Sequence, residues 1–263
     1  MVSRGAPQSR THPAVRGFHR AARTYESGRP EYPIAAIRYI ARRFRLGRTS
    51  TIVELGSGTG KLTRLLMRTG ATVVPIEPTP GMRAEFARQI PALPVLDGVA
   101  EEMPLPSNIA DAVVAAQAFH WFRPRPAFRE IARVLRSGGG VALIWNRRDE
   151  STPWVGEVGR LLDRYMRTVP RSRDDGWRRA LEKGDLPFTP ILKRSFRHVQ
   201  QLTPATAVDR FLSVSAIAVQ PARERARIAR KLRRLLAAAP ETRGRARFGL
   251  PYRTDVYLFR KMR

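Results

Sequence analysis

One stretch near the start of the chain constrains its fold more than any other. The run from Thr51 to Leu55 is short, β-branched and apolar, with the acid Glu54 near its end. The glycine-rich turn 56–60 follows, and then leucines at helical spacing from Leu62. Glycine has no Cβ, so this turn can bend sharply and lie close to a ligand. The order strand, tight turn, helix is typical of the opening unit of an α/β nucleotide-binding fold.

A second strand is predicted about twenty residues further on, the spacing known from dinucleotide folds. The run 72–77 is β-branched and apolar and ends in Glu77. A carboxylate at the end of this strand can bind both hydroxyls of a ribose. The glycine turn and Glu77 together therefore predict a nucleoside-binding site.

Two better-known glycine loops do not fit the turn. A phosphate-binding P-loop needs Ser or Thr after Gly-Lys, whereas Leu62 follows Gly60-Lys61 here. The dinucleotide fingerprint places its third glycine three residues after the second, where this chain has Lys61. A dehydrogenase would therefore require an unusual glycine spacing.

The spacing Gly-x-Gly-x-Gly, preceded two residues earlier by Glu54, resembles the first motif of the class I S-adenosylmethionine-dependent methyltransferases. In that family Glu77 would hold the ribose of the cofactor. The resemblance implies that the methionine part of S-adenosylmethionine is cradled by Glu54, Gly56, Ser57, Gly58 and Gly60.

Three further motifs, and the lead-in at 25–33 described in the next paragraph, extend the resemblance over about residues 25–148. The stretch 97–106 resembles the third motif, in which backbone around Ala100 and Glu101 brackets the adenine. The stretches 111–122 and 133–145 resemble the fourth strand and the helix, glycine turn and fifth strand of the family. The resemblance implies an α/β Rossmann-like fold with a seven-stranded, mostly parallel sheet and helices on both faces.

The lead-in to the glycine turn points to one subgroup. Tyr25-Glu-Ser-Gly-Arg-Pro-Glu-Tyr-Pro33, together with Phe119-His-Trp-Phe122, is similar to methyltransferases of the trans-aconitate type, which act on small acids. The resemblance implies that this lead-in, with Tyr25 and Arg29, closes over the cofactor. Arg29 would pair with the methionine carboxylate. The alternative is a surface arginine on a proline-punctuated turn.

The carboxyl end of the predicted strand 110–116 is the expected reaction site, because ligands of open α/β sheets collect outside these ends. Gln117 is a candidate for cofactor or substrate contact. His120 is the candidate general base. Its alternative role is structural, with the ring bonded to local backbone. Trp121 is predicted to line the substrate site, or else to pack on the next helix.

The rest of the chain completes one domain. Residues 1–24 read as a basic mobile tail, and residues 25–150 as the cofactor-binding core. The glycines 138–140 are predicted as the exit from a helix into a strand at 141–145. Residues 151–263 are predicted to add a helical cap and closing strands. The strongest helix there, 221–239, buries leucines on one face and carries arginines on the other.

Composition limits the chemistry. The chain of 263 residues has no cysteine, which excludes disulfides, thiolate metal sites and cysteine nucleophiles, and no metal site is predicted. No apolar run is long enough for a membrane helix, and the absence of a secretory signal predicts a cytoplasmic protein. The net charge of +27 suggests nucleic acid or acidic substrates. A compositional preference for arginine is the favoured explanation, because the charge is spread along the whole chain rather than concentrated beside the motifs.

The sequence therefore predicts an S-adenosylmethionine-dependent methyltransferase with a small-molecule acceptor that carries a carboxylate or a hydroxyl. Two alternatives stay open. The charge suggests a nucleic-acid methyltransferase, although residues 116–120 lack the Asn/Asp-Pro-Pro-aromatic element of amine methyltransferases and the cytosine-C5 route needs a cysteine. A cofactor-binding relative without catalysis is the other alternative. The oligomeric state is not predicted.

Overall fold

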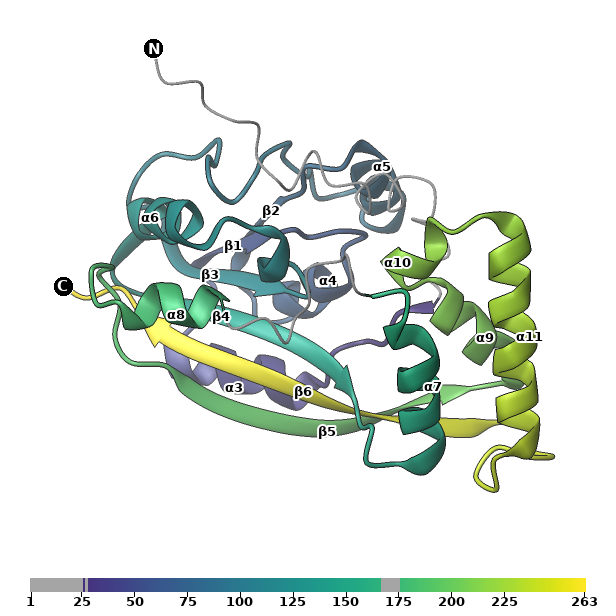
Figure 1. Cartoon of the computed structure of the whole chain (residues 1–263). Helices are drawn as coiled ribbons and strands as arrows, with labels where there is room; N and C mark the ends of the chain where they lie inside the picture. Colours follow the sequence, from purple (N-terminus) through teal and green to yellow (C-terminus); the bar gives the residue numbers. More distant parts are fainter. Residues whose placement is uncertain (1–25, 27, 167–175) are drawn as a thin grey trace, which may run out of the picture.

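A six-stranded sheet organises the molecule (Figure 1). The computed structural model describes residues 26, 28–166 and 176–263, so the predicted basic tail and Tyr25 lie outside the described residues. The strand order is β2-β1-β3-β4-β6-β5. The first four strands in this order run parallel, and β6 is antiparallel to both of its neighbours. The strands are β1 (Thr51–Leu55), β2 (Thr72–Ile76), β3 (Ala110–Ala116), β4 (Leu135–Arg148), β5 (Leu192–Leu202) and β6 (Phe248–Arg260).

The prediction of seven strands is wrong by one for the described residues. At the β2 edge of the sheet, a further strand is reduced to a single parallel bridge between Leu96 and Ile76. Pro94 precedes this pair, and proline has no N–H to donate to a ladder. The mostly parallel Rossmann-like arrangement itself is present.

The strands bury both faces, because successive side chains of a strand point to opposite sides. Ile52 of β1 belongs to the core cluster under α3 and α4, whereas its neighbour Val53 belongs to the cluster under α6 and α8. This alternation explains why the strands read as continuous apolar runs. The helices of the two layers are α3 (Ile34–Phe44), α4 (Lys61–Met67), α6 (Pro124–Val134) and α8 (Gly176–Glu182), with α5 (Pro80–Gln89) following β2.

A separate group of helices packs on the long antiparallel end of the sheet (Figure 1). Its members are α7 (Pro153–Asp163), α9 (Pro204–Leu212), α10 (Ser215–Ala218) and α11 (Ala222–Ala238). These helices share a core with Phe248, Leu250 and Tyr252 of β6. Thr203 starts α9 with a reciprocal hydrogen-bonded cap to Thr206.

The glycines after α6 form an irregular start of β4 rather than a separate turn. The β3–β4 register shifts between Ala110 and Ala112, and Gly138 has a φ of 73°. A Cβ on Gly140 would lie 2.5 Å from the ring of Phe44, so only glycine lets α3 pack this closely. In the described ranges, no helix combines the length and apolar character that crossing a bilayer requires.

Candidate active site

The glycine turn between β1 and α4 has the backbone that only glycine adopts readily. Gly56, Gly58 and Gly60 have φ values of 64°, 59° and 88°. A Cβ on Gly56 would lie 2.7 Å from Ala118, and one on Gly60 would lie 2.7 Å from Ile90. These two glycines are therefore required by packing as well as by conformation.

Gly58 differs from its neighbours because it faces open space. No atom lies within 4 Å of the position that its Cβ would occupy. Beside it, the Ser57 hydroxyl is buried without a hydrogen-bond partner among the described residues. Buried polar groups are normally paired, so an unpaired hydroxyl in a glycine turn fits a site for a polar ligand.

Glu77 directly follows β2, and its carboxylate holds the glycine turn through a hydrogen bond. Its Oε2 accepts a hydrogen bond from the Gly58 N–H at 3.0 Å, and its Oε1 accepts one from the Thr79 N–H at 2.9 Å. Burial raises the pKa of Glu77, although these hydrogen bonds oppose the shift. Each carboxylate oxygen has a second lone pair. The geometry is therefore compatible with the predicted ribose contact, which stays a prediction.

Glu54 is the second acid at this edge of the sheet. It is 2% exposed, and the Thr63 hydroxyl donates a hydrogen bond to its Oε2 at 2.6 Å. Burial raises its pKa to about 8, the Thr63 hydrogen bond opposes this, and the nearby charge of Glu77 adds to it. Glu54 is therefore uncharged at neutral pH in the ligand-free protein, and a cation bound beside it would favour its ionised form.

The described part of the predicted lead-in crosses the glycine turn. Glu26 accepts hydrogen bonds from the hydroxyl of Thr59 and from Arg64, and lies 3.5 Å from the ammonium of Lys61. Burial alone would raise the pKa of Glu26, but the Thr59 hydrogen bond and the two cations lower it. The Asn146 amide donates to the Glu31 carbonyl at 3.2 Å, which ties the lead-in to β4.

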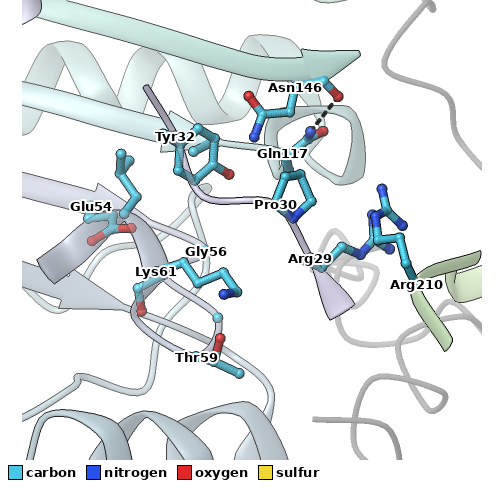
Figure 2. A pocket seen from close by; sticks show the side chains of 14 residues that line it. Arg29, Pro30, Tyr32, Glu54, Gly56, Thr59, Lys61, Gln117, Asn146 and Arg210 are labelled. Carbon is cyan, nitrogen blue, oxygen red and sulfur yellow. Dashed lines mark hydrogen bonds between the residues drawn. The ribbon is translucent and has the colours of Figure 1, made fainter. Parts of the chain in front are cut away.

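A pocket opens between this lead-in, the glycine turn and the carboxyl ends of β3 and β4 (Figure 2). The predicted residues that line it are Arg29, Glu54, Gly56, Ser57, Gly58 and Gln117. Residues that the sequence analysis did not single out also line it, namely Pro30, Tyr32, Thr59, Lys61, Leu62, Ala116, Asn146 and Arg210. Asn146 directly follows the predicted strand 141–145, so the rule for carboxyl ends could have found it. No sequence signal pointed to Arg210.

Gln117 has a strained backbone at this pocket. Its φ is 54°, which is uncommon for a residue other than glycine. Its side-chain amide donates to the Asn146 carbonyl at 2.7 Å, the contact drawn in Figure 2. Such strain is concentrated at functional sites, and here it turns the chain out of β3 beside the glycine turn.

His120 lies on the short helix η1 (Phe119–Trp121) that follows Gln117. The indole N–H of Trp145 donates to its Nδ1 at 3.5 Å. Burial lowers the pKa of His120 to about 3, and the positive charges of Arg29 and Arg147 contribute. The ring is therefore neutral at physiological pH. Because Nδ1 accepts a hydrogen bond, the proton of the neutral ring is on Nε2.

Gly60, Glu77 and His120 do not line this pocket, and the remaining predicted residues also lie outside its lining. Trp121 is partly exposed, with its ring centroid 5.3 Å from that of His120. Ala100 is buried, and the Glu101 carboxylate accepts a hydrogen bond from the Arg123 N–H at 2.7 Å, at the start of α6. The Glu101 side chain thus stabilises a helix end, which leaves backbone for the predicted adenine contact.

Comparison with known proteins assigns this arrangement to a family. The family described as methyltransferase domain matches residues 53–143. An uncharacterised methyltransferase of Mycobacterium tuberculosis is 39% identical over 241 residues, which cover 90% of this chain and 92% of the relative. The chain belongs to the class I methyltransferases. Their methyl donor is S-adenosylmethionine, and this membership implies the same donor here.

Other similar proteins agree with this assignment. An uncharacterised methyltransferase-like protein of Schizosaccharomyces pombe is 38% identical over 147 residues, covering 56% of this chain and 57% of that protein. Among solved structures, a candidate type II methyltransferase of Anaeromyxobacter dehalogenans has a TM-score of 0.63 at 24% identity. That alignment covers 89% of this chain and 97% of the other. At this identity, the structural likeness shows the fold.

The residues of this methyltransferase fit the implied cofactor. Gly58 leaves open space at the turn, and the unpaired Ser57 hydroxyl offers a polar contact beside it. The buried acids Glu54 and Glu77 suit a molecule that carries an ammonium and a sulfonium. The individual contacts stay predictions.

Proposed function

We propose that this methyltransferase transfers a methyl group from S-adenosylmethionine to a small-molecule acceptor that carries a carboxylate or a hydroxyl. One observation carries the proposal. A single pocket joins the glycine turn, where the cofactor is expected, to Gln117 and Asn146 at the carboxyl ends of β3 and β4. An acceptor in this pocket would meet the methyl group while enclosed by the lead-in and α9.

The proposed cofactor contacts follow from the glycine turn outward. Gly56, Ser57, Gly58 and Gly60 would hold the methionine part, with Glu54 beneath them and Tyr25, Arg29 and Gln117 beside it. Glu77 would hold the ribose, and backbone at Ala100 and Glu101 would bracket the adenine. When bound, S-adenosylmethionine supplies a methyl group that is already activated by its sulfonium. The chain then mainly needs to position the acceptor oxygen in line and to exclude water.

His120 supports a carboxylate acceptor over a hydroxyl. A ring with a pKa of about 3 and a proton on Nε2 is a weak base but a good hydrogen-bond donor. In this proposal His120 donates to an acceptor oxygen and orients it, while Trp121 forms one wall of the acceptor site. A carboxylate needs no base, because it is already ionised at neutral pH.

We also propose that α7, α9, α10 and α11 form a cap over the acceptor. Arg210 of α9 lines the pocket, and the Arg29 guanidinium donates to the carbonyl of Ser213 just after α9. The Arg29-Pro30 lead-in and the Phe119–Phe122 segment favour the subgroup that includes trans-aconitate methyltransferases. Small acids are the acceptors in that subgroup.

The test uses S-adenosylmethionine with a labelled methyl group. The purified protein is incubated with the labelled donor and a cell extract, and small molecules, protein and nucleic acid are then separated. We expect label in the small-molecule fraction, and mass analysis would identify the acceptor. Label in nucleic acid would contradict the proposal and would give the basic face of α11 a function. Cofactor binding without any labelled product would favour the non-catalytic alternative.

A further inference from the structure

Arg210 is a buried arginine in the wall of the candidate pocket. It lies near the end of α9, is 4% exposed and lines the pocket together with Gly56 and Gln117. Figure 2 shows its side chain on the same side of the pocket as Arg29. It is therefore a charged group held inside the protein at the proposed reaction site.

The guanidinium of Arg210 is only partly satisfied. Its Nε donates to the Tyr252 hydroxyl at 2.9 Å. Its Nη1 is buried without a hydrogen-bond partner, and no carboxylate of the described residues forms an ion pair with it. An arginine cannot neutralise itself by losing a proton in the way that a buried lysine can. A buried, unpaired guanidinium is costly, which indicates that a ligand supplies the missing anion.

The surroundings of Arg210 add positive charge. Burial lowers the pKa of Arg148, and the charge of Arg210 lowers it further. Gly28 packs closely against the α9 backbone, since a Cβ on it would lie 3.4 Å from the Arg210 Cα. The next residue, Arg29, is therefore held on the same wall of the pocket as Arg210. Of the described acids, Glu150 lies 3.5 Å from Arg148 but pairs with that residue rather than with Arg210.

Asp255, the buried acid of β6, is already shared. It lies within 4.0 Å of side-chain nitrogens of Arg147, Lys193 and Arg253. It therefore does not compensate the pocket wall, whose excess of positive charge favours an anion.

The position of Arg210 is fixed by packing. Tyr252 is 2% exposed, and its ring stacks on His198 with centroids 5.3 Å apart and an interplanar angle of 19°. The Tyr252 hydroxyl thus holds the Nε edge of the guanidinium and leaves the Nη atoms for a ligand. A guanidinium held in this way is preorganised for the planar oxygens of a carboxylate.

We propose that Arg210 binds a carboxylate of the methyl acceptor. This inference rests on the proposed function, and it narrows the acceptor to an anionic small molecule. The cofactor has one carboxylate of its own, for which Arg29 is the predicted partner. The pocket presents two guanidinium groups, so the second one is available to the acceptor.

The first measurement separates the two carboxylates. S-adenosylhomocysteine is titrated by calorimetry into wild type, Arg29→Met and Arg210→Met. We expect Arg29→Met to lose at least about tenfold in affinity and Arg210→Met to stay within about threefold, since a charged contact contributes roughly 1.5–3 kcal/mol. A tenfold loss in Arg210→Met would assign this guanidinium to the cofactor and overturn the inference.

The second measurement detects the acceptor anion directly. Succinate, citrate and the neutral succinamide are titrated into wild type saturated with S-adenosylhomocysteine. We expect at least one acid to bind, succinamide not to bind, and Arg210→Met to weaken the acid at least about tenfold. Arg133→Met, which removes an arginine already paired with Glu130, is the matched control and should bind the acid as wild type does. Equal binding of acid by wild type and Arg210→Met, or no binding of either acid, overturns the inference.

Stability separates a binding role from a structural one. Without ligands, Arg210→Met should melt at or above the wild-type temperature, because it removes a buried unpaired charge. A fall of more than about 4 °C, roughly 1–2 kcal/mol for a chain of this size, would assign Arg210 to packing with Tyr252. Arg210→Lys keeps the charge without the planar fork and should recover part of the acid affinity, which tests the site even if the methionine variant folds poorly.

Failure of this inference is distinct from failure of the proposed function. If wild type does not bind S-adenosylhomocysteine, the proposed function itself is wrong. If it binds and the labelled acceptor is a neutral molecule, only the role of Arg210 is wrong.

Discussion

The two sides of the pocket differ in the ionisable groups that they carry. On the side built by β1 and β2, the buried Glu54 lines the pocket and the buried Glu77 lies behind the glycine turn. Burial raises the pKa of Glu54 to about 8, and the charge of Glu77 adds to this shift. The side built by the lead-in and α9 has arginines, with Arg29 and Arg210 lining the pocket. Burial lowers the pKa of His120 to about 3, and the charges of Arg29 and Arg147 add to this shift. A cationic cofactor and an anionic acceptor would thus each meet a complementary wall.

This difference shows that total charge is a poor guide to the site. The chain has a formal charge of +27, yet the predicted cofactor wall is acidic. The arginines of α11 are largely exposed and contribute to the total without lining the pocket. Local burial, rather than net charge, determines which group would bind which ligand.

The largest expected effect tests the cofactor side. Gly58→Val places a β-branched residue at a φ of 59° and fills the open space above the turn. We expect affinity for S-adenosylhomocysteine to fall at least about 1000-fold, or about 4 kcal/mol, by calorimetry. Gly184→Val is the control, because Gly184 also has a positive φ and open space but lies on an exposed loop. Equal losses in both variants would contradict a cofactor contact at Gly58.

The next largest effect tests the protonation state of Glu54 on this side through the pH dependence of stability. Burial raises the pKa of Glu54 from 4.5 to about 8 in the folded protein. Between these values the unfolded chain loses the proton and the folded chain keeps it, so stability falls as pH rises from about 5 to 8. Glu54→Gln should not show this loss. The free energy of unfolding of the variant minus that of wild type should therefore be roughly 3 kcal/mol larger at pH 8 than at pH 5.

Denaturant unfolding of the ligand-free protein at several pH values measures this effect. Glu157→Gln, at an exposed position on α7, is the control and should follow wild type. A Glu54→Gln advantage that is the same at pH 5 and pH 8 would mean that Glu54 is already ionised in the fold.

A third prediction places the ribose on the acidic side. Glu77→Ala removes both the expected ribose contact and the hydrogen bond that fixes the Gly58 N–H. We expect about a 100-fold loss of S-adenosylhomocysteine affinity, or roughly 2.7 kcal/mol. Glu85→Ala, which removes another buried glutamate on α5, should bind normally. Normal binding by Glu77→Ala would show that the ribose lies elsewhere.

The smallest effect concerns His120, which lies on η1 after β3 and outside the pocket lining. His120→Phe should lower turnover about 10- to 30-fold, up to roughly 2 kcal/mol, with cofactor affinity unchanged. His120→Gln keeps a donor near the Nε2 position and should restore most of the rate. Since the pKa is about 3, the rate of wild type should show no inflection near pH 6.5.

Steady-state rates with the acceptor found by labelling test this prediction. Glu157→Gln, at an exposed position on α7, is the control and should leave turnover unchanged. An inflection near pH 6.5 that disappears in His120→Gln would instead establish His120 as a general base.

By itself, the sequence determined the cofactor side of this protein. Residues 51–77 form β1, the glycine turn, α4 and β2 as predicted, because apolar strands, positive-φ glycines and an amphipathic helix are local properties of a contiguous stretch. Gln117 also followed from the rule that ligands collect at the carboxyl ends of strands. The number of strands was not determined in this way. Leu96 makes only a single bridge to Ile76 beside β2, because strand pairing depends on the neighbouring segment as well as on local sequence.

Only the tertiary structure decided the opposite side. Arg210 is one of many arginines in the sequence, and it differs from them because α9 packs against β6, which buries it beside Tyr252 and leaves one nitrogen unpaired. The neutral state of His120 likewise depends on its burial and on the charges of Arg29 and Arg147, which lie far from it in the chain. Burial and charge–charge distances arise from contacts between distant segments, and residue order alone does not specify them.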